Sequence, residues 1–440
     1  MIRLALPGTI LLGLTLAGLS LHTPGSGIVG TPQAAVELVV ILCVSAAVYL
    51  AAVSGVLYWG APRRGIWIVL LVAIALRVPL IVSPAFLSSD INRYVWDGRV
   101  QVAGISPYRY IPDDPALAFL RDTAIFPHIN RADYAPTIYP PGAQVIFAIV
   151  AWVWSGPTGI KLAMVGFEIL AVFCLMRLLA AASLPAERVL IYAWNPLPVW
   201  AFAGNGHIDA AVAGFVSLAL LLRVRRRDGW AGAALGLAVL TKLLPAVVAP
   251  VLWRRGGGWR LALTATATVA AFYALYSGVG WRVFGFLGGY GAEEGLNDGS
   301  GLWLLNLVRR VVALPAAAGP VYLAGLAIVL AGLGAQYAFV RRPDGAVALC
   351  GAAGTMMAVL TAGLGPPYPW YFAWLAVPAT VSPNPAVLWL ATVPVLMYLE
   401  GYRDSLAWSS AIYGPAALLA IAAFLYPRLK PIEGTIRCPR

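Results

Sequence analysis

Apolar runs of membrane-spanning length follow one another along the 440-residue chain. A transmembrane helix needs about 20 mostly apolar residues. Runs near that length predict spans at about 4–21, 34–58, 65–83, 160–182, 188–203, 206–222, 259–278, 319–340, 344–363, 369–382, 385–400 and 409–426. The pattern predicts an all-α polytopic membrane protein with about 13 crossings.

The basic residues orient these spans, because arginine and lysine accumulate on the cytoplasmic side of a membrane. We expect Arg63 and Arg64, the arginines of 223–227 and 254–255, and the basic tail on that side. A full crossing at 141–155 would put 223–227 outside, so this segment is expected to be a juxtamembrane or re-entrant helix. By the same reasoning, 230–252 is expected to be a hairpin of two short helices, with Lys242 near its outer tip.

Composition narrows the class of protein. Hydrophobic residues make up 61% of the chain and charged residues only 11%, with 30 Lys and Arg against 18 Asp and Glu. Soluble domains carry about 25% charged residues, so a soluble enzyme, a disordered chain and a nucleic-acid-binding domain are excluded. We expect one membrane domain over 1–440 that includes a structured outer loop at 84–160.

The outer loop begins with a candidate catalytic acid. If a helix starts near residue 90, Asp90, Arg93, Tyr94 and Asp97 share one face. The Asp90 carboxylate could then accept a proton from an incoming hydroxyl, and the arginines would keep it ionised. An equally good interpretation is an interfacial amphipathic helix capped by Asp90, with its acids paired to Arg93 and Arg99.

Two further polar groups interrupt apolar segments. Asn205, His207 and Asp209 join two predicted spans, and ionisable residues at such a depth are costly and often functional. Helix capping would explain Asn205 and Asp209 but not His207. Lys242 follows a predicted helix and precedes Pro245, where a compact cation suits a lipid-linked phosphate; alternatively, it reaches to lipid headgroups.

Aromatic residues next to prolines mark other turns. Tyr108 and Tyr139 could supply the aromatic walls of a site, although an interfacial aromatic belt with turn residues explains them better. The same belt is the favoured interpretation of Trp370 and Tyr371. The glycine-rich loop at 285–301 carries acidic residues and fits a mobile lid or a solvated turn equally well. The sequence has no Walker loop, zinc motif or nucleophile elbow.

Taken in order, these segments resemble the GT-C superfamily of integral-membrane glycosyltransferases. The resemblance is closest to the bacterial polyprenol-phosphate-mannose-dependent mannosyltransferases of the glycosyltransferase 87 and α-1,6-mannosyltransferase group. The stretches that carry it are SDINRYVWDGR at 89–99, GISPY at 104–108, IYPP at 138–141, WNP at 194–196, GHID at 206–209, TK at 241–242 and PWY at 369–371.

The resemblance implies roles for these residues. Asp90 would be the catalytic base, preceded by Ser89 where some relatives have a second acid. Lys242 would lie near the donor phosphate, and Arg93 or Arg99 could help to stabilise its charge. The candidates for substrate binding are Asp97, Tyr108, Tyr139, Asn205, His207, Asp209, Trp370 and Tyr371.

The implied reaction transfers a hexose, with mannose as the first candidate, from a polyprenyl phosphate to a glycan or lipid acceptor. The site would face the extracytoplasmic side of the cell membrane. The expected partners are the polyprenyl-phosphate sugar, a glycan or glycolipid acceptor and the lipid bilayer, but no nucleic acid. No cofactor is expected, and one acid beside a histidine does not indicate a divalent metal.

Two other functions fit parts of the pattern. A transporter or flippase of lipid-linked sugars would share a cationic, aromatic-lined groove. Such proteins commonly have paired broken helices in two related halves, whereas this chain offers one hairpin without a counterpart. A non-catalytic scaffold subunit would not depend on Asp90, His207 or Lys242.

Overall fold

The computed structural model describes residues 2–22, 32–60, 64–315, 317–399 and 405–425. Arg63 and the basic tail, both expected on the cytoplasmic side, lie outside these ranges. Helices dominate the described ranges, and no strand occurs within them. The all-α expectation is therefore confirmed.

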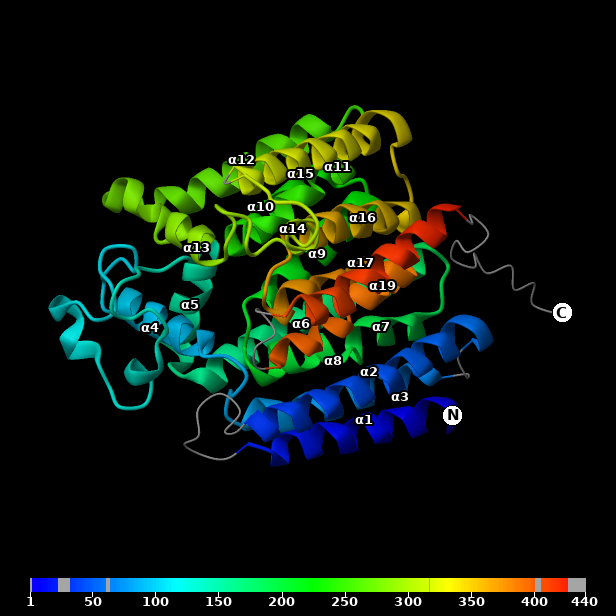
Figure 1. The fold of residues 1–440 in the computed structure, drawn as a ribbon, viewed down its shortest axis with the longest axis horizontal. Helices are drawn as coiled ribbons and strands as arrows, with labels where there is room; N and C mark the ends of the chain where they lie inside the picture. The colour runs from blue at the N-terminus through cyan, green and yellow to red at the C-terminus, as the bar shows by residue number, and fades with distance from the viewer. Residues whose placement is uncertain (1, 23–31, 61–63, 316, 400–404, 426–440) are drawn as a thin grey trace.

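The first three helices form a group of their own. α1 (Ile2–Ser20), α2 (Pro32–Trp59) and α3 (Gly65–Val82) are long and apolar and lie side by side along one edge of the molecule (Figure 1). α3 leads into the outer loop, which lies at the end of the molecule opposite the N-terminus.

The remaining helices vary widely in length. The α-helices are α4 (Asp90–Val102), α5 (Pro141–Trp154), α6 (Pro157–Ala181), α7 (Leu190–Ala193), α8 (Pro196–Pro198), α9 (Asp209–Val224), α10 (Asp228–Thr241), α11 (Ala249–Leu252), α12 (Gly258–Ala274), α13 (Leu287–Glu293), α14 (Trp303–Arg309), α15 (Ala318–Ala335), α16 (Ala346–Leu364), α17 (Ala376–Val381), α18 (Pro385–Leu390) and α19 (Leu406–Leu425). The 3₁₀ segments are η1 (Pro115–Leu120), η2 (Phe126–His128), η3 (Ala186–Val189), η5 (Leu244–Val248), η6 (Ser277–Phe284), η8 (Pro369–Leu375) and η9 (Val393–Tyr398), and the π-helical segments are η4 (Val199–Gly204) and η7 (Gln336–Arg341).

Fewer helices can span a membrane than the sequence predicted. Within the described ranges, seven are long and apolar enough, or up to nine if two bent pairs each count as one span. The runs at 188–203 and 369–382, and the run from 385 as far as residue 399, are instead chains of short helices. Prolines interrupt them, and most of their side chains are buried in the protein. The expectation of about 13 crossings was wrong because buried protein cores and lipid-facing helices are equally apolar.

The segment after α9 folds back on itself. α10 ends at Thr241, Lys242 has an extended backbone, and η5 and α11 return toward the start of α10. An ion pair between Arg254 and Asp228 joins the two ends of the segment. This arrangement places Lys242 at the far tip, away from the arginines.

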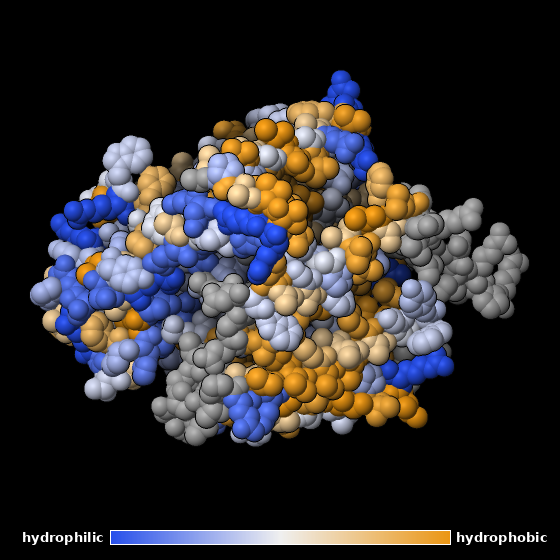
Figure 2. Space-filling view, in the orientation of Figure 1, coloured by the Kyte–Doolittle hydropathy of each residue, from blue (hydrophilic) through white to orange (hydrophobic). Residues whose placement is uncertain are grey.

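The surface is divided by polarity. Hydrophilic side chains gather at the end that holds α4 and the outer loop, whereas apolar side chains cover much of the middle of the molecule (Figure 2). This distribution is typical of a multi-pass membrane protein, because lipid surrounds the middle and water the ends.

Candidate functional site

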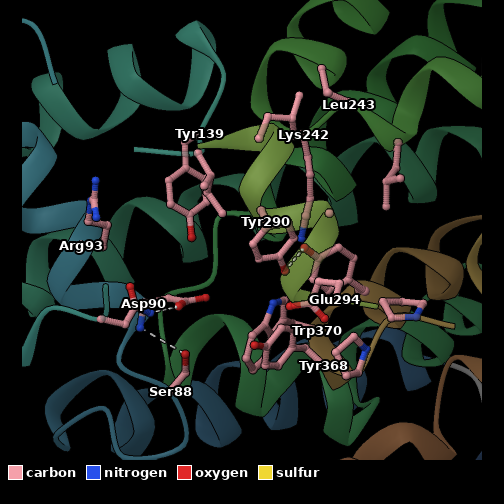
Figure 3. Close-up of a pocket in the computed structure, with 18 of the residues that line it drawn as sticks. Ser88, Asp90, Arg93, Tyr139, Lys242, Leu243, Tyr290, Glu294, Tyr368 and Trp370 are labelled. Carbon is pink, nitrogen blue, oxygen red and sulfur yellow. Dashed lines mark hydrogen bonds between the residues drawn. The ribbon is translucent and has the colours of Figure 1, made fainter. Parts of the chain in front are cut away.

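A cavity of about 910 Å³ lies at the end of the molecule that carries α4. Segments far apart in the sequence build its wall, and Figure 3 shows side chains from several of them around one space. They are the start of α4, the loop at 130–140, the tip of the 228–254 hairpin, the α13 region and the turn at 364–371. A cavity of this size accommodates a ligand larger than one sugar.

Asp90, the first residue of α4, lines this cavity. The side-chain amide of Asn130 donates to its Oδ1 at 2.7 Å, and the Asp90 side chain is 20% exposed. Burial raises the pKa of the carboxyl, although Asn130, Lys242 and Arg131 oppose the rise. Its contacts point toward the cavity wall, whereas a helix cap would bond the backbone of α4.

Lys242 reaches the cavity from the hairpin tip. Its Nζ donates to Asp209 Oδ1 at 2.7 Å and lies 3.3 Å from the ring centroid of Tyr371, a cation–π contact. The Lys242 side chain is 17% exposed, so it is held by protein groups and does not extend to lipid headgroups. Asp90 and Lys242 thus border one space (Figure 3).

His207 lies behind the wall, next to Asp90. The π-helical segment η4 ends at Gly204, and Gly206 takes a left-handed conformation with φ of 68° before α9 begins at Asp209. A side chain at residue 206 would also collide with Ile91. The imidazole of His207 is fully buried, and its Nδ1 lies 3.8 Å from Asp90 Oδ2.

Aromatic rings form another part of the wall. Trp370 stacks on His207 at 3.7 Å and on Tyr368 at 4.8 Å between ring centroids. Tyr290 and Tyr371 join their hydroxyls at 2.9 Å, which links the α13 region to the turn at 364–371. The rings are therefore packed into the protein and are not the loose interfacial belt that the sequence favoured.

Arg93 and Asp97 neutralise each other inside the outer loop. Arg93 Nε donates to Asp97 Oδ1 at 2.9 Å, and both terminal nitrogens of the guanidinium donate to the carbonyl of Ala135. The other oxygen of Asp97 accepts from Gln144 at 2.9 Å. Arg93 lines the cavity, but its donors are engaged, and Asp97 does not line it.

Three other predicted site residues also lie off the cavity wall. Arg99 pairs with Asp122 at 2.5 Å within the outer loop. Tyr108 is buried and donates its hydroxyl to the carbonyl of Tyr139 at 2.7 Å. Asn205 accepts from the Leu87 amide at 2.9 Å, so its role is to tie segments together.

His207 and Asp209 likewise do not line the cavity, since the imidazole is shielded and the carboxylate is bonded to Lys242. The predicted residues that do line it are Asp90, Arg93, Tyr139, Lys242, Trp370 and Tyr371.

Sequence reasoning missed several lining residues: Asn130, Arg131, Tyr290, Glu294 and Tyr368. Glu294 follows α13, in the glycine-rich loop for which the sequence allowed either a mobile lid or a solvated turn. Tyr368 lies beside the predicted Trp370. No pattern distinguished Asn130 and Arg131 from other polar residues of the loop.

The α13 region is fastened to the outer loop. Glu293 accepts from Arg131 at 2.6 Å and from Tyr134 at 2.8 Å. The Phe286 amide also donates to the carbonyl of Thr137 at 3.1 Å. These contacts make the α13 region one wall of the cavity.

The described residues contain no cluster of three or more His, Cys, Asp and Glu side chains that could hold a metal ion. The charged groups of the cavity are instead the acids Asp90 and Glu294 and the cations Arg93, Arg131 and Lys242. Such a wall can accept a proton on one side and bind an anion on another.

Comparison with known proteins gives one match. A model of glycosyltransferase family 87 matches residues 137–363, just over half of the chain. The matched range includes Tyr139, His207, Asp209 and Lys242, whereas Asp90 and Trp370 lie outside it. No curated protein and no solved structure matches the chain.

Proposed function

Since this chain belongs to glycosyltransferase family 87, a glycosyltransferase family of GT-C type, we propose that it transfers a hexose from a polyprenyl phosphate to a glycan or lipid acceptor. Mannose is the first candidate for the sugar. The family match confirms that the chain is a glycosyltransferase, as the resemblance implied. The donor, the sugar, the acceptor and the extracytoplasmic side of the site are our proposal.

One observation carries it: a carboxylate and an ammonium that are distant in the sequence border the same cavity. Asp90 comes from the start of α4 and Lys242 from the hairpin tip. A glycosyl transfer needs a base for the acceptor hydroxyl and a positive charge for the departing phosphate.

In the proposed reaction, the acceptor oxygen attacks the anomeric carbon and forms the new glycosidic bond. Its proton passes to the carboxylate of Asp90. The bond between the anomeric carbon and the phosphate oxygen breaks, and the polyprenyl phosphate leaves with the electron pair. Lys242 stabilises the charge on this leaving group. A single displacement of this kind inverts the anomeric centre.

The apolar part of the cavity supports a lipid-linked donor. Leu243, Leu244, Phe284 and Leu287 line the same space as Lys242. A phosphate held at Lys242 would therefore have apolar surface beside it for the first isoprene units. A nucleotide sugar would not use such a surface, and the sequence lacks a nucleotide-binding loop.

The test uses full-length protein in membranes of a strain that lacks the gene, with radiolabelled polyprenyl-phosphate mannose as donor. Asp90→Asn should lower transfer into endogenous glycans or lipids by about 100-fold or more, since general bases contribute that much. Asp133→Asn, an exposed change in the same loop, should leave transfer intact. Full transfer by a folded Asp90→Asn variant would contradict the assignment. Movement of the donor across the vesicle membrane without new glycosidic bonds would instead support a transporter or flippase of lipid-linked sugars.

A further inference from the structure

His207 is a buried polar side chain without a hydrogen bond. Its imidazole is 0% exposed, and neither ring nitrogen has a hydrogen-bond partner among the described residues. Buried polar side chains nearly always have partners, so an exception requires an explanation. Its shielded position rules out the direct contact with the sugar that the sequence suggested.

The polar group next to this imidazole is the carboxylate of Asp90. Nδ1 of His207 lies 3.8 Å from Asp90 Oδ2, while Asn130 already holds Oδ1 at 2.7 Å. A neutral imidazole with its proton on Nδ1 can donate to a carboxylate. The gap exceeds a hydrogen bond by about 1 Å, and catalytic hydrogen bonds commonly tighten when substrate binds.

The ring of His207 is held in place from other sides. Trp370 stacks on it at 3.7 Å with an angle of 17° between the ring planes. The His207 amide donates to the carbonyl of Ala201 at 3.1 Å, and the left-handed turn at Gly206 fixes the chain before it. The Asp90 carboxylate borders open space in the cavity. We therefore expect the Asp90 carboxylate, and not the ring of His207, to move when the 3.8 Å gap between them closes.

We infer that His207 is a positioning residue that acts on the reaction through Asp90. Its Nδ1–H donates to Asp90 Oδ2 when the acceptor binds, while Asn130 holds Oδ1. The two donors fix the plane of the carboxylate, and a remaining lone pair faces the acceptor hydroxyl. This inference rests on the proposed role of Asp90 as the base.

The bond would also set the pH at which Asp90 is ionised. The charged or titratable groups around Asp90 are Lys242 from the hairpin, Arg131 and Tyr139 from the outer loop, Tyr94 from α4, and Asp209 from α9. A hydrogen bond from His207 favours the ionised carboxylate, in the same direction as the bond from Asn130. Its loss should make ionisation require a higher pH.

The experiment compares three substitutions of histidine in the full-length protein. His207→Phe keeps a ring against Trp370 and removes both nitrogens, whereas His207→Asn places an amide N–H near the position of Nδ1. His128→Phe, at an exposed histidine of the outer loop, is the matched control. Transfer from radiolabelled polyprenyl-phosphate mannose is measured across pH.

His207→Phe should move the acidic limb of kcat/KM upward by about one pH unit and lower kcat by about tenfold. The KM for the donor should change little, because His207 does not touch it. His207→Asn should return the acidic limb most of the way to its original pH and restore most of kcat. His128→Phe should match the unmodified protein in both. An unshifted limb in His207→Phe, or no rescue by Asn, would overturn the inference.

A second readout does not require turnover. Infrared titration of the purified protein follows the protonated-carboxyl band that Asp90→Asn removes. The midpoint of that band should rise in His207→Phe and return toward the original value in His207→Asn; equal midpoints would overturn the inference. If Asp90→Asn transfers mannose normally, the proposed role of Asp90 as the base fails instead, and the infrared result still decides whether His207 acts on Asp90.

Discussion

Lys242 is held on two sides, by the Asp209 carboxylate at 2.7 Å and by the ring of Tyr371 at 3.3 Å. Asp209 is nearly buried, and its second oxygen has no hydrogen-bond partner among the described residues. The negative charge of Asp209 is therefore tolerated because Lys242 is next to it. Lys242 has two roles in this arrangement: it stabilises the fold and it presents a cation to the cavity.

Substitution of Lys242 should separate these two roles. Lys242→Met leaves the Asp209 charge buried without a partner, which should lower the free energy of unfolding in detergent by about 3 kcal/mol or more. Adding Asp209→Asn should recover most of that stability, whereas transfer from the polyprenyl-phosphate donor should stay lost. Thermal unfolding and transfer assays on both variants measure the two effects. Recovery of transfer in the double variant would contradict the phosphate role.

Asn130 should tune the pH dependence of the reaction. It donates to Asp90 Oδ1 and so favours the ionised carboxylate, against the effect of burial on the pKa. Asn130→Ala should raise the pKa of Asp90 further, which removes the ionised base at low pH. The acidic limb of the kcat/KM profile should move upward by about one pH unit, with activity recovering at higher pH.

The control for this prediction lies on α4. The side-chain amide of Asn92 donates to the carbonyl of His128 at 3.4 Å, whereas that of Asn130 donates to Asp90. Asn92→Ala should therefore keep the original pH profile. If the acidic limb moved equally in both variants, its pH would depend on the loop as a whole and not on the hydrogen bond to Asp90.

At the scale of elements, α4 is positioned by close packing against α5. A Cβ added at Gly98 would run into the carbonyl oxygen of Phe147 and lie 2.8 Å from the Cβ of Ala151. Backbone atoms cannot move aside as a flexible side chain does. The absence of a side chain at Gly98 therefore lets the helix that begins with Asp90 rest directly on α5.

Gly98→Ala should push these two helices apart. We expect a loss of about 1–3 kcal/mol in the free energy of unfolding, together with a lower kcat, because α4 carries the proposed base. Gly166→Ala in α6 is the matched control, since its Cβ would meet nothing within 4 Å. It should be neutral or stabilise the protein by up to about 1 kcal/mol. Equal unfolding temperatures for both variants would contradict this account.

At the scale of the whole molecule, the cavity and the arginine-rich ends of the 228–254 hairpin lie apart. If arginines mark the cytoplasm, the cavity faces the other side. In a chain whose four cysteines are replaced by serine, Asp133→Cys should react with an impermeant maleimide in intact cells. Arg255→Cys should react only after permeabilisation. The reverse labelling pattern would place the site on the cytoplasmic side.

Several features could be predicted from local sequence. The helices α1, α2, α3, α6, α15, α16 and α19 coincide with predicted apolar runs, because the hydrophobic length needed to cross a bilayer is a local property. The start of α4 at Asp90 was predicted as well. The resemblance carried by short motifs identified the family, which the family match confirmed.

Tertiary structure decided the partners of the polar residues. Arg99 and Asn205 stand in the same motifs as Asp90 and His207, yet one pairs with Asp122 and the other bonds the Leu87 amide. Sequence spacing cannot distinguish these outcomes, since each depends on a segment many residues away. For the same reason, Asn130 could not be identified as a site residue from the sequence, because only the fold places it beside Asp90.

The sequence by itself thus determined a helical membrane protein of a glycosyltransferase family, because the length of an apolar run and the residues of a short motif depend only on neighbouring positions in the chain. Only the tertiary structure decided which apolar runs are buried as broken helices and that Asp90 and Lys242 border one cavity. Burial and side-chain pairing depend on contacts between distant segments, and those contacts exist only in the folded chain.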